Sequence, residues 1–256
     1  MIPDWPVTAL FAVLGAAVGS FLNVCIHRLP QHHSIVRPAS RCPACGRAIR
    51  WFENIPVVSW LALRARCAGC GSRIPVMYPA VELATAAIFA AGYLVFGLTP
   101  LLVVRLAFAS ALVVLAVTDL RERILPNAIT YPGIVAGLIC SFFLPPGPKD
   151  SLLGVLIGAG LPFLVGEAFY RLRGIEGLGM GDVKMLGMIG AFLGWQLALF
   201  TLFAASILGV LVGVPMTLIR RDRYYQIPLG TFLALGALVA AFVGDEIVGW
   251  YVGFYR

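Results

Sequence analysis

The sequence predicts an all-α polytopic membrane protein, with about eight transmembrane helices and a small zinc-binding cytoplasmic subdomain. Three observations lead to this prediction. Hydrophobic residues make up 60% of the 256 residues, charged residues only 12%, and the mean hydropathy is +0.92, which lies outside the range of soluble globular proteins. The apolar residues form runs of about 20, the length that crosses a bilayer. One polar, cysteine-rich segment interrupts these runs near the N-terminus.

The helices are expected in a defined order along the chain. The first run has no basic residues before it and no clear small-residue cleavage site after it, so we expect a retained helix and not a removed signal peptide. The segment 183–219 should hold either two short helices with a tight turn near Gly194 and Trp195, or one longer tilted helix. The expected spans are 7–27, 80–98, 101–120, 128–144, 151–170, 183–196, 198–219 and 228–248.

The basic residues predict the orientation of these spans. If the spans alternate, sixteen of the 19 Lys and Arg residues fall on the side of segment 28–79, and only Lys149 and Arg256 fall on the other. This bias places the basic side in the cytoplasm and both termini outside it, as expected for an inner-membrane protein. The formal net charge of +7 therefore reflects topology and attraction to anionic membrane lipid. We expect no nucleic-acid partner.

Three regions follow from this topology. Residues 1–29 form the first transmembrane helix, residues 30–79 a cytoplasmic cysteine-rich loop, and residues 80–256 a transmembrane bundle. The loop is the only segment long and polar enough to form a soluble subdomain. A bundle of this size can bury a polar site between its helices, away from lipid.

Four cysteines of the loop have the spacing of a metal site. Cys42 and Cys45 are separated by two residues, as are Cys67 and Cys70, and each pair is followed by a glycine. Two such turns complete the tetrahedral thiolate set that structural zinc prefers. A catalytic or transient metal and a disulfide or redox pair are the alternatives, but a reducing cytosol disfavours disulfides. The metal should supply much of the folding energy of this small segment.

Asp119 is the first of two acidic residues that a membrane bundle does not need for structure. It ends a run in which 16 of the 20 residues from Leu101 to Leu120 are apolar. An acid at that depth is expensive. The negative end of the helix dipole makes the site still less favourable for a carboxylate. A functional role is therefore the main hypothesis for Asp119, and a structural role is the alternative.

Asp182 in "GLGMGDVKML" has two interpretations. At the start of a helix, a carboxylate can cap free N–H groups, or it can pair with Asp119 at the same cytoplasmic depth. Two close carboxylates share a proton, so one activates water while the other polarises a peptide carbonyl. The helix dipoles predict Asp182 as the ionised base and Asp119 as the protonated acid. Gly179 and Gly181 would let a substrate backbone approach.

Together these segments resemble the bacterial type IV prepilin leader peptidases, bifunctional members of the GxGD class of intramembrane aspartyl proteases. The resemblance rests on "GSFLNVCIHRLP" (residues 19–30), on the cysteine loop, on "TDLRERILPN" (118–127) and on "GLGMGDVKML" (177–186). "IPLGTFLALGA" (227–237) is similar to the last span of the family, with Leu229 and Thr231 at positions where Phe and Pro are usual.

The resemblance implies two activities. The first is cleavage of the basic leader from type IV prepilins and type II secretion pseudopilins by Asp119 and Asp182. The second is methylation of the new amine with S-adenosylmethionine, an activity that goes with the cysteine loop in this family. Asn23, His27, Arg28 and Glu82 are candidates for binding the methyl donor or the substrate. Ordinary interface or helix-packing roles are the alternatives for all four.

Two other functions remain possible on the residues alone. One is a presenilin-like protease that cuts within the bilayer, and the long cysteine loop and the interfacial acids argue against it. The other is a transporter that carries a zinc module and uses the two acids on a proton path. A proton path would place its acids near the middle of the membrane, and these two lie at its edge.

Overall fold

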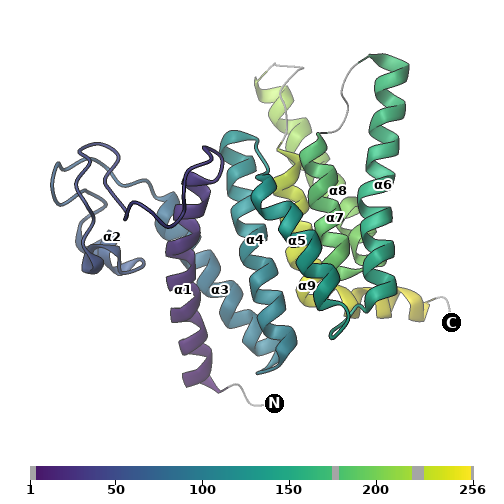
Figure 1. The fold of residues 1–256 in the computed structure, drawn as a ribbon, viewed down its shortest axis with the longest axis horizontal. Coiled ribbons are helices and arrows are strands. Elements are labelled where there is room, and N and C mark those ends of the chain that lie inside the picture. The colour runs from purple at the N-terminus through teal and green to yellow at the C-terminus, as the bar shows by residue number, and fades with distance from the viewer. Residues whose placement is uncertain (1–3, 175–178, 221–227, 255–256) are drawn as a thin grey trace. The chain divides into compact units, whose positions relative to one another are not determined.

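The computed structural model describes residues 4–174, 179–220 and 228–254, and this part of the chain is largely helical (Figure 1). Five of its helices are long and apolar enough to cross a membrane. The expectation of about eight spans is not confirmed by that count. The helices are α1 (Trp5–Arg28), η1 (Trp51–Asn54), α2 (Val58–Ala62), α3 (Met77–Phe96), α4 (Pro100–Glu122), α5 (Asn127–Cys140), α6 (Pro148–Arg173), α7 (Met180–Leu193), α8 (Trp195–Arg220) and α9 (Leu229–Phe254).

The segment 183–219 forms two helices, one of the two outcomes that the sequence allowed. Helix α7 ends at Leu193, and α8 begins at Trp195. Gly194 between them has a φ of +83°, a backbone conformation that other residues adopt only with strain. The tight turn predicted near Gly194 is therefore confirmed.

The chain divides into two compact units, Met1–Val114 and Leu115–Arg256. In the first unit, α1 and α3 pack side by side along much of their length (Figure 1). Gly15 makes this contact close, because a Cβ there would lie 2.7 Å from the Thr85 carbonyl oxygen and from the Phe89 Cβ. Small residues at helix contacts are the usual means by which transmembrane helices approach each other.

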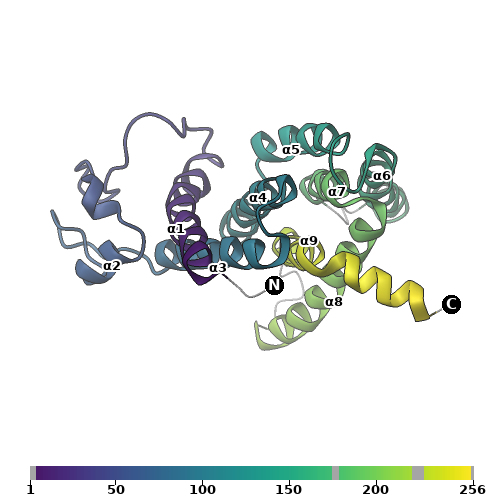
Figure 2. The same cartoon turned by 90° about the horizontal axis from the view of Figure 1, so that it is seen from below.

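In the second unit, α7 lies among α5, α6, α8 and α9 (Figure 2). Its side chains are accordingly buried, with Met185, Leu186 and Ile189 fully inaccessible. Gly154 of α6 and Gly190 of α7 bring the two backbones together, and a Cβ on either glycine would collide with the other residue's main chain. This packing determines where the first turn of α7 lies within the second unit.

Candidate active site, cysteine cluster and cavities

Asp119 lies in the last turn of α4 and is buried, with 6% of its surface exposed. Its Oδ2 accepts a hydrogen bond of 2.7 Å from the backbone N–H of Thr231. The Thr231 hydroxyl lies 3.2 Å from the same oxygen and 3.1 Å from the Ala116 carbonyl oxygen, so it can donate to either. Thr231 is the third residue of α9, and its N–H is one that the helix cannot satisfy internally. The carboxylate of Asp119 therefore caps the start of α9.

Two glycines and a leucine shape the space around this carboxylate. A Cβ on Gly230 would lie 3.0 Å from both Cγ and Oδ2 of Asp119, so glycine lets the acid lie against the α9 backbone. The Leu125 side chain would be 3.1 Å from that same Cβ and 3.2 Å from a Cβ on Gly181. Leu125 thus packs between the start of α9 and the start of α7.

Asp182 is the third residue of α7 and is partly buried. No hydrogen bond to its carboxylate is found among residues 4–174, 179–220 and 228–254. The carboxylates of Asp182 and Asp119 lie close enough to interact electrostatically. A Cβ on Gly179 would lie 3.3 Å from Asp182 Oδ2, with no other heavy atom of the described chain within 4 Å. The structure therefore brings the two acids together, while an approach of substrate along Gly179 and Gly181 stays a prediction.

The four loop cysteines form one cluster. Their sulfur atoms all lie within 4.8 Å of one another, and the Sγ atoms of Cys42 and Cys70 are 3.9 Å apart. A tetrahedral site with metal–sulfur bonds of about 2.3 Å needs sulfurs about 3.8 Å apart, so the cluster can hold a metal ion. The cysteines are free thiols, which gives no support to the disulfide alternative.

Two nearly identical turns build the cluster. The Gly46 N–H donates to the Cys42 carbonyl, and the Gly71 N–H donates to the Cys67 carbonyl, each at 2.9 Å. Both glycines have a positive φ, +70° and +73°. The backbone N–H groups of Cys45 and Ala44 lower the pKa of the Cys42 thiol to about 6, which favours the thiolate that a metal binds.

The four residues considered for binding of the methyl donor line a single cavity of about 680 Å³ in the first unit. They are Asn23, His27, Arg28 and Glu82. Asn23 is buried, and its Nδ2 donates to the Tyr78 carbonyl at 3.1 Å. Arg28 donates to the carbonyl oxygens of Ser34 and Pro38, at 2.9 and 2.8 Å, and so orders the chain that leaves α1. His27 is exposed at the rim.

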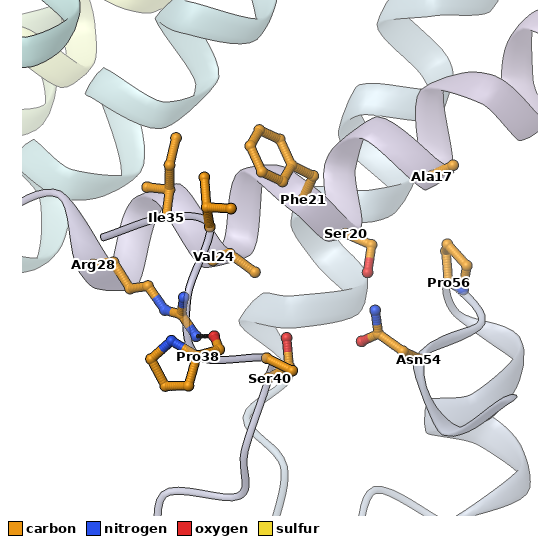
Figure 3. Close-up of a pocket in the computed structure, with 12 residues that line it drawn as sticks. Ala17, Ser20, Phe21, Val24, Arg28, Ile35, Pro38, Ser40, Asn54 and Pro56 are labelled. Atoms are coloured by element: carbon orange, nitrogen blue, oxygen red, sulfur yellow. Dashed lines mark hydrogen bonds between the residues drawn. The ribbon is translucent and has the colours of Figure 1, made fainter. Parts of the chain in front are cut away.

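Glu82 is the one acid among the four, and like Asn23 it is buried. Its Oε2 accepts a 2.7 Å hydrogen bond from the N–H of Val57, a residue with a φ of +60°. The acid thus fastens a strained turn of the cytoplasmic segment to α3. A smaller cavity of about 390 Å³ adjoins the large one, between α1 and the segment that holds Ile35, Pro38 and Ser40 (Figure 3).

Sequence reasoning missed some residues of these sites. Gly230 and Thr231 are 111 and 112 residues from Asp119, and only the departure of Thr231 from the usual proline distinguished that position. Arg47 was also missed: its Nη2 lies 2.8 Å from both carboxylate oxygens of Glu53. Its position directly after the first Cys-x-x-Cys-Gly sequence was the available signal.

The described helices and the paired acids define a multi-pass membrane protein with a candidate aspartyl active site. Residues 13–96 match the model of the bacterial peptidase A24 N-terminal domain, and residues 106–214 match that of the type IV leader peptidase family. The chain belongs to the type IV leader peptidase family, which confirms the resemblance noted in the sequence.

Several proteins named "prepilin leader peptidase/N-methyltransferase" are similar to this chain. One from Pseudomonas putida is 37% identical over 96% of this chain and 94% of its own length, and one from Pseudomonas aeruginosa is 36% identical over 94% and 92%. One from Myxococcus xanthus is 48% identical over 83% of this chain, which spans 64% of that protein. No solved structure matches the chain. These matches favour a leader peptidase over the presenilin-like and transporter alternatives.

Proposed function

We propose that this protein removes the leader peptide from pilin-like precursors and then methylates the amine that cleavage exposes. The names of the similar proteins support both activities, since each is a prepilin leader peptidase and an N-methyltransferase. The substrates are type IV prepilins and type II secretion pseudopilins. The protein works in the inner membrane, in contact with lipid, with both termini outside the cytoplasm.

The observation that carries the peptidase proposal is the pairing of Asp119 with Asp182. They come from α4 and α7, lie in one compact unit, and interact electrostatically. Two neighbouring carboxyl groups hold one proton between them at neutral pH. The ionised group takes a proton from water as the water attacks the scissile carbonyl, and the protonated group donates a hydrogen bond to the carbonyl oxygen. No covalent intermediate with the enzyme is needed.

The position of the two acids along their helices fits this substrate. Asp119 lies in the last turn of a membrane-length helix, and Asp182 lies in the first turn of α7, directly after the GMG sequence. In the predicted topology both positions face the cytoplasmic surface. A precursor with a basic leader in the cytosol and an apolar helix in the bilayer places its scissile bond at this depth.

The metal of the cysteine cluster is proposed to be a structural zinc ion. Cys42, Cys45, Cys67 and Cys70 supply four thiolates, a set that leaves no coordination position open for substrate. Zinc would then hold together a segment that has few buried apolar residues of its own. The segment goes with the methylation activity, for which S-adenosylmethionine is the proposed methyl donor.

The test of the peptidase proposal is replacement of each acid. Asp119→Asn and Asp182→Asn keep the shape of the side chain but remove the titrating group, so each should lower leader removal at least about a thousandfold. The measurement is the mass of the product formed by the purified protein from a prepilin peptide. A control variant is Glu122→Gln, an exposed acid at the end of the same helix as Asp119. Normal cleavage by either aspartate variant would overturn the assignment.

A further inference from the structure

We propose that the cavity of about 680 Å³ in the first unit is the site of the methyl donor, an inference that rests on the proposed function. The cavity lies where the end of α1 and the start of α3 meet the cysteine segment. Pockets for small organic ligands are commonly about 300 to 1,000 Å³, so this cavity is large enough for a nucleoside such as the methyl donor. All of the lining residues belong to positions 20–82, inside the first unit.

The charges on the wall match a ligand that carries a carboxylate and a cationic sulfur. Arg37, Arg41 and Arg73 line the cavity, and no ion pair of theirs is found within the described part of the chain. Their guanidinium groups can pair with the carboxylate of the donor. Glu82, a buried acid of α3 that also lines the cavity, can supply negative charge for the ammonium or the sulfonium.

Aromatic and amide groups on the wall suit the adenine. Trp60 and Tyr78 line the cavity, and aromatic side chains of this kind can stack on a base. The Trp60 Nε1 donates to the Ile74 carbonyl at 3.2 Å, which fixes its ring. The Oδ1 of buried Asn23 has no hydrogen-bond partner in the described chain, and an unpaired buried acceptor is costly. An amino group of the ligand near Asn23 would remove that cost.

The smaller cavity gives the amine of the substrate a route to the donor. Both cavities share the side chains of Ser20, Val24 and Arg28, so they are contiguous; Figure 3 shows these three residues in the wall of the smaller one. The smaller one is apolar along α1, where Phe21 and Val24 line it, which suits the apolar first residue of a cleaved pilin-like helix. S-adenosylmethionine supplies a methyl carbon on a cationic sulfur: the amine lone pair forms the N–C bond, the C–S electron pair passes to sulfur, and the ammonium product releases a proton to solvent.

Binding of S-adenosylhomocysteine to the purified full chain, measured by calorimetry, tests the donor site without turnover. Arg73→Glu should weaken binding at least about tenfold, because it replaces a partner of the ligand carboxylate with a repelling charge. Arg64→Glu, an exposed change in the same segment outside both cavities, should stay within about twofold of wild type. Wild-type affinity in Arg73→Glu places the donor elsewhere. A wild-type chain that neither binds this probe nor methylates contradicts the methyltransferase half of the proposed function itself.

The acceptor route has a separate readout. Ala17→Trp fills the smaller cavity alone and should raise the KM for a leader-free pilin peptide at least about tenfold, with affinity for S-adenosylhomocysteine unchanged. Val13→Trp, one turn earlier on α1 and outside both cavities, is the matched control. An unchanged KM in Ala17→Trp would show that the acceptor peptide does not bind in the smaller cavity.

A second inference rests on the hydrogen bonds of the other unit: we infer that Thr231 is a positioning residue that makes Asp119 the negatively charged member of the pair. Its N–H and hydroxyl both reach Asp119 Oδ2, at 2.7 and 3.2 Å. The hydrogen bond from the N–H favours the charged form of the carboxylate, and the hydroxyl adds to this effect when it donates to Oδ2 and not to the Ala116 carbonyl. Asp182 has no such donor within the described part of the chain.

This assignment reverses the one that the helix dipoles of α4 and α7 suggested. The negative end of α4 does lie beside Asp119, but the positive end of α9 reaches the same carboxylate through Thr231. A direct hydrogen bond of 2.7 Å outweighs a diffuse dipole. Asp119 then takes the proton from water, and Asp182 donates its proton to the carbonyl oxygen.

The dependence of kcat for leader cleavage on pH tests this inference. Thr231→Pro removes both donors at a position where the first turn of a helix tolerates proline. It should move the acid side of the profile to higher pH, because Asp119 then ionises less readily. Thr231→Ser keeps both donors and should restore the wild-type profile. A pH profile that moves only on its basic side would show that Asp182, not Asp119, is the negatively charged acid. A profile that does not move would show that Thr231 has only a structural role.

Discussion

The two units of this protein use opposite ways of placing reactive groups. In the first unit the four cysteines lie within 29 residues of sequence, and two local turns bring their sulfurs together. In the second unit Asp119 and Asp182 are 63 residues apart, and Thr231 follows another 49 residues later. Packing of α4, α7 and α9 alone brings them to one place. A local site can fold around a metal, whereas a dispersed site depends on the whole bundle.

Substitutions in the cysteine cluster should have the largest effect, and they should affect one activity of the protein far more than the other. Cys42→Ser combined with Cys45→Ser removes two of four ligands, so the bound zinc should fall from about one per chain to near zero. Methylation of a leader-free peptide should drop at least about a hundredfold as the cavity wall loses its order. Leader cleavage should stay within a few-fold of wild type, because its acids lie in the other unit.

The measurements are metal content by elemental analysis and the two product masses. Cys140→Ser, at a cysteine outside the cluster, is the control and should retain its metal. An equal loss of both activities in the double variant would show that the two units do not work separately.

Close glycine contacts provide a second way to separate the units. Gly154→Ala drives a methyl group into the Gly190 backbone between α6 and α7, and should lower stability by about 1–3 kcal/mol. Leader cleavage should then be lost at a lower temperature than binding of the methyl donor. Thermal inactivation of each activity in detergent measures the difference.

Gly160→Ala in the same helix is the matched control, since no heavy atom of the described chain lies within 4 Å of the added Cβ. Gly15→Ala is the counterpart in the first unit and should reverse the order of the two losses. Parallel loss of both activities in Gly154→Ala and in Gly15→Ala would argue for a single cooperative structure.

The smallest effect concerns the link between Arg47 and Glu53. The hydrogen bond from Arg47 lowers the pKa of Glu53 below its ordinary value of 4.5, so the pair helps the folded loop above that pH. The contribution is lost as the pH falls through the lowered pKa. Glu53→Gln should therefore make the loop more sensitive to protease at pH 7, with the difference from wild type shrinking below about pH 4. A constant difference across this range would mean that packing, not charge, holds Glu53.

Much of the fold could be predicted from the sequence, because the patterns that predict it lie within short segments of the chain. Apolar runs predicted the membrane helices, the turn at Gly194 was confirmed, and the Cys-x-x-Cys-Gly pairs predicted the cluster. The number of spans was harder, because α5 and α7 have only 14 residues each and do not reach the usual spanning length.

The details of the candidate active site were beyond a sequence argument. The sequence places Asp119 beside the negative end of its own helix dipole, but the N–H group that donates to its carboxylate belongs to α9, more than a hundred residues away. The same limitation applies to the cavities. Asn23, Arg28 and Glu82 were chosen as separate polar residues, and only the packing of α1 against α3 shows that they share one wall.

The central claim is that one unit cleaves and the other methylates. The most direct measurement gives purified Asp182→Asn two peptides, an intact precursor and the same pilin peptide without its leader, and reads their masses. We predict no cleavage of the precursor and methylation of the leader-free peptide at a rate close to wild type. Loss of methylation on the leader-free peptide, in a variant that still binds S-adenosylhomocysteine, would contradict this division of labour.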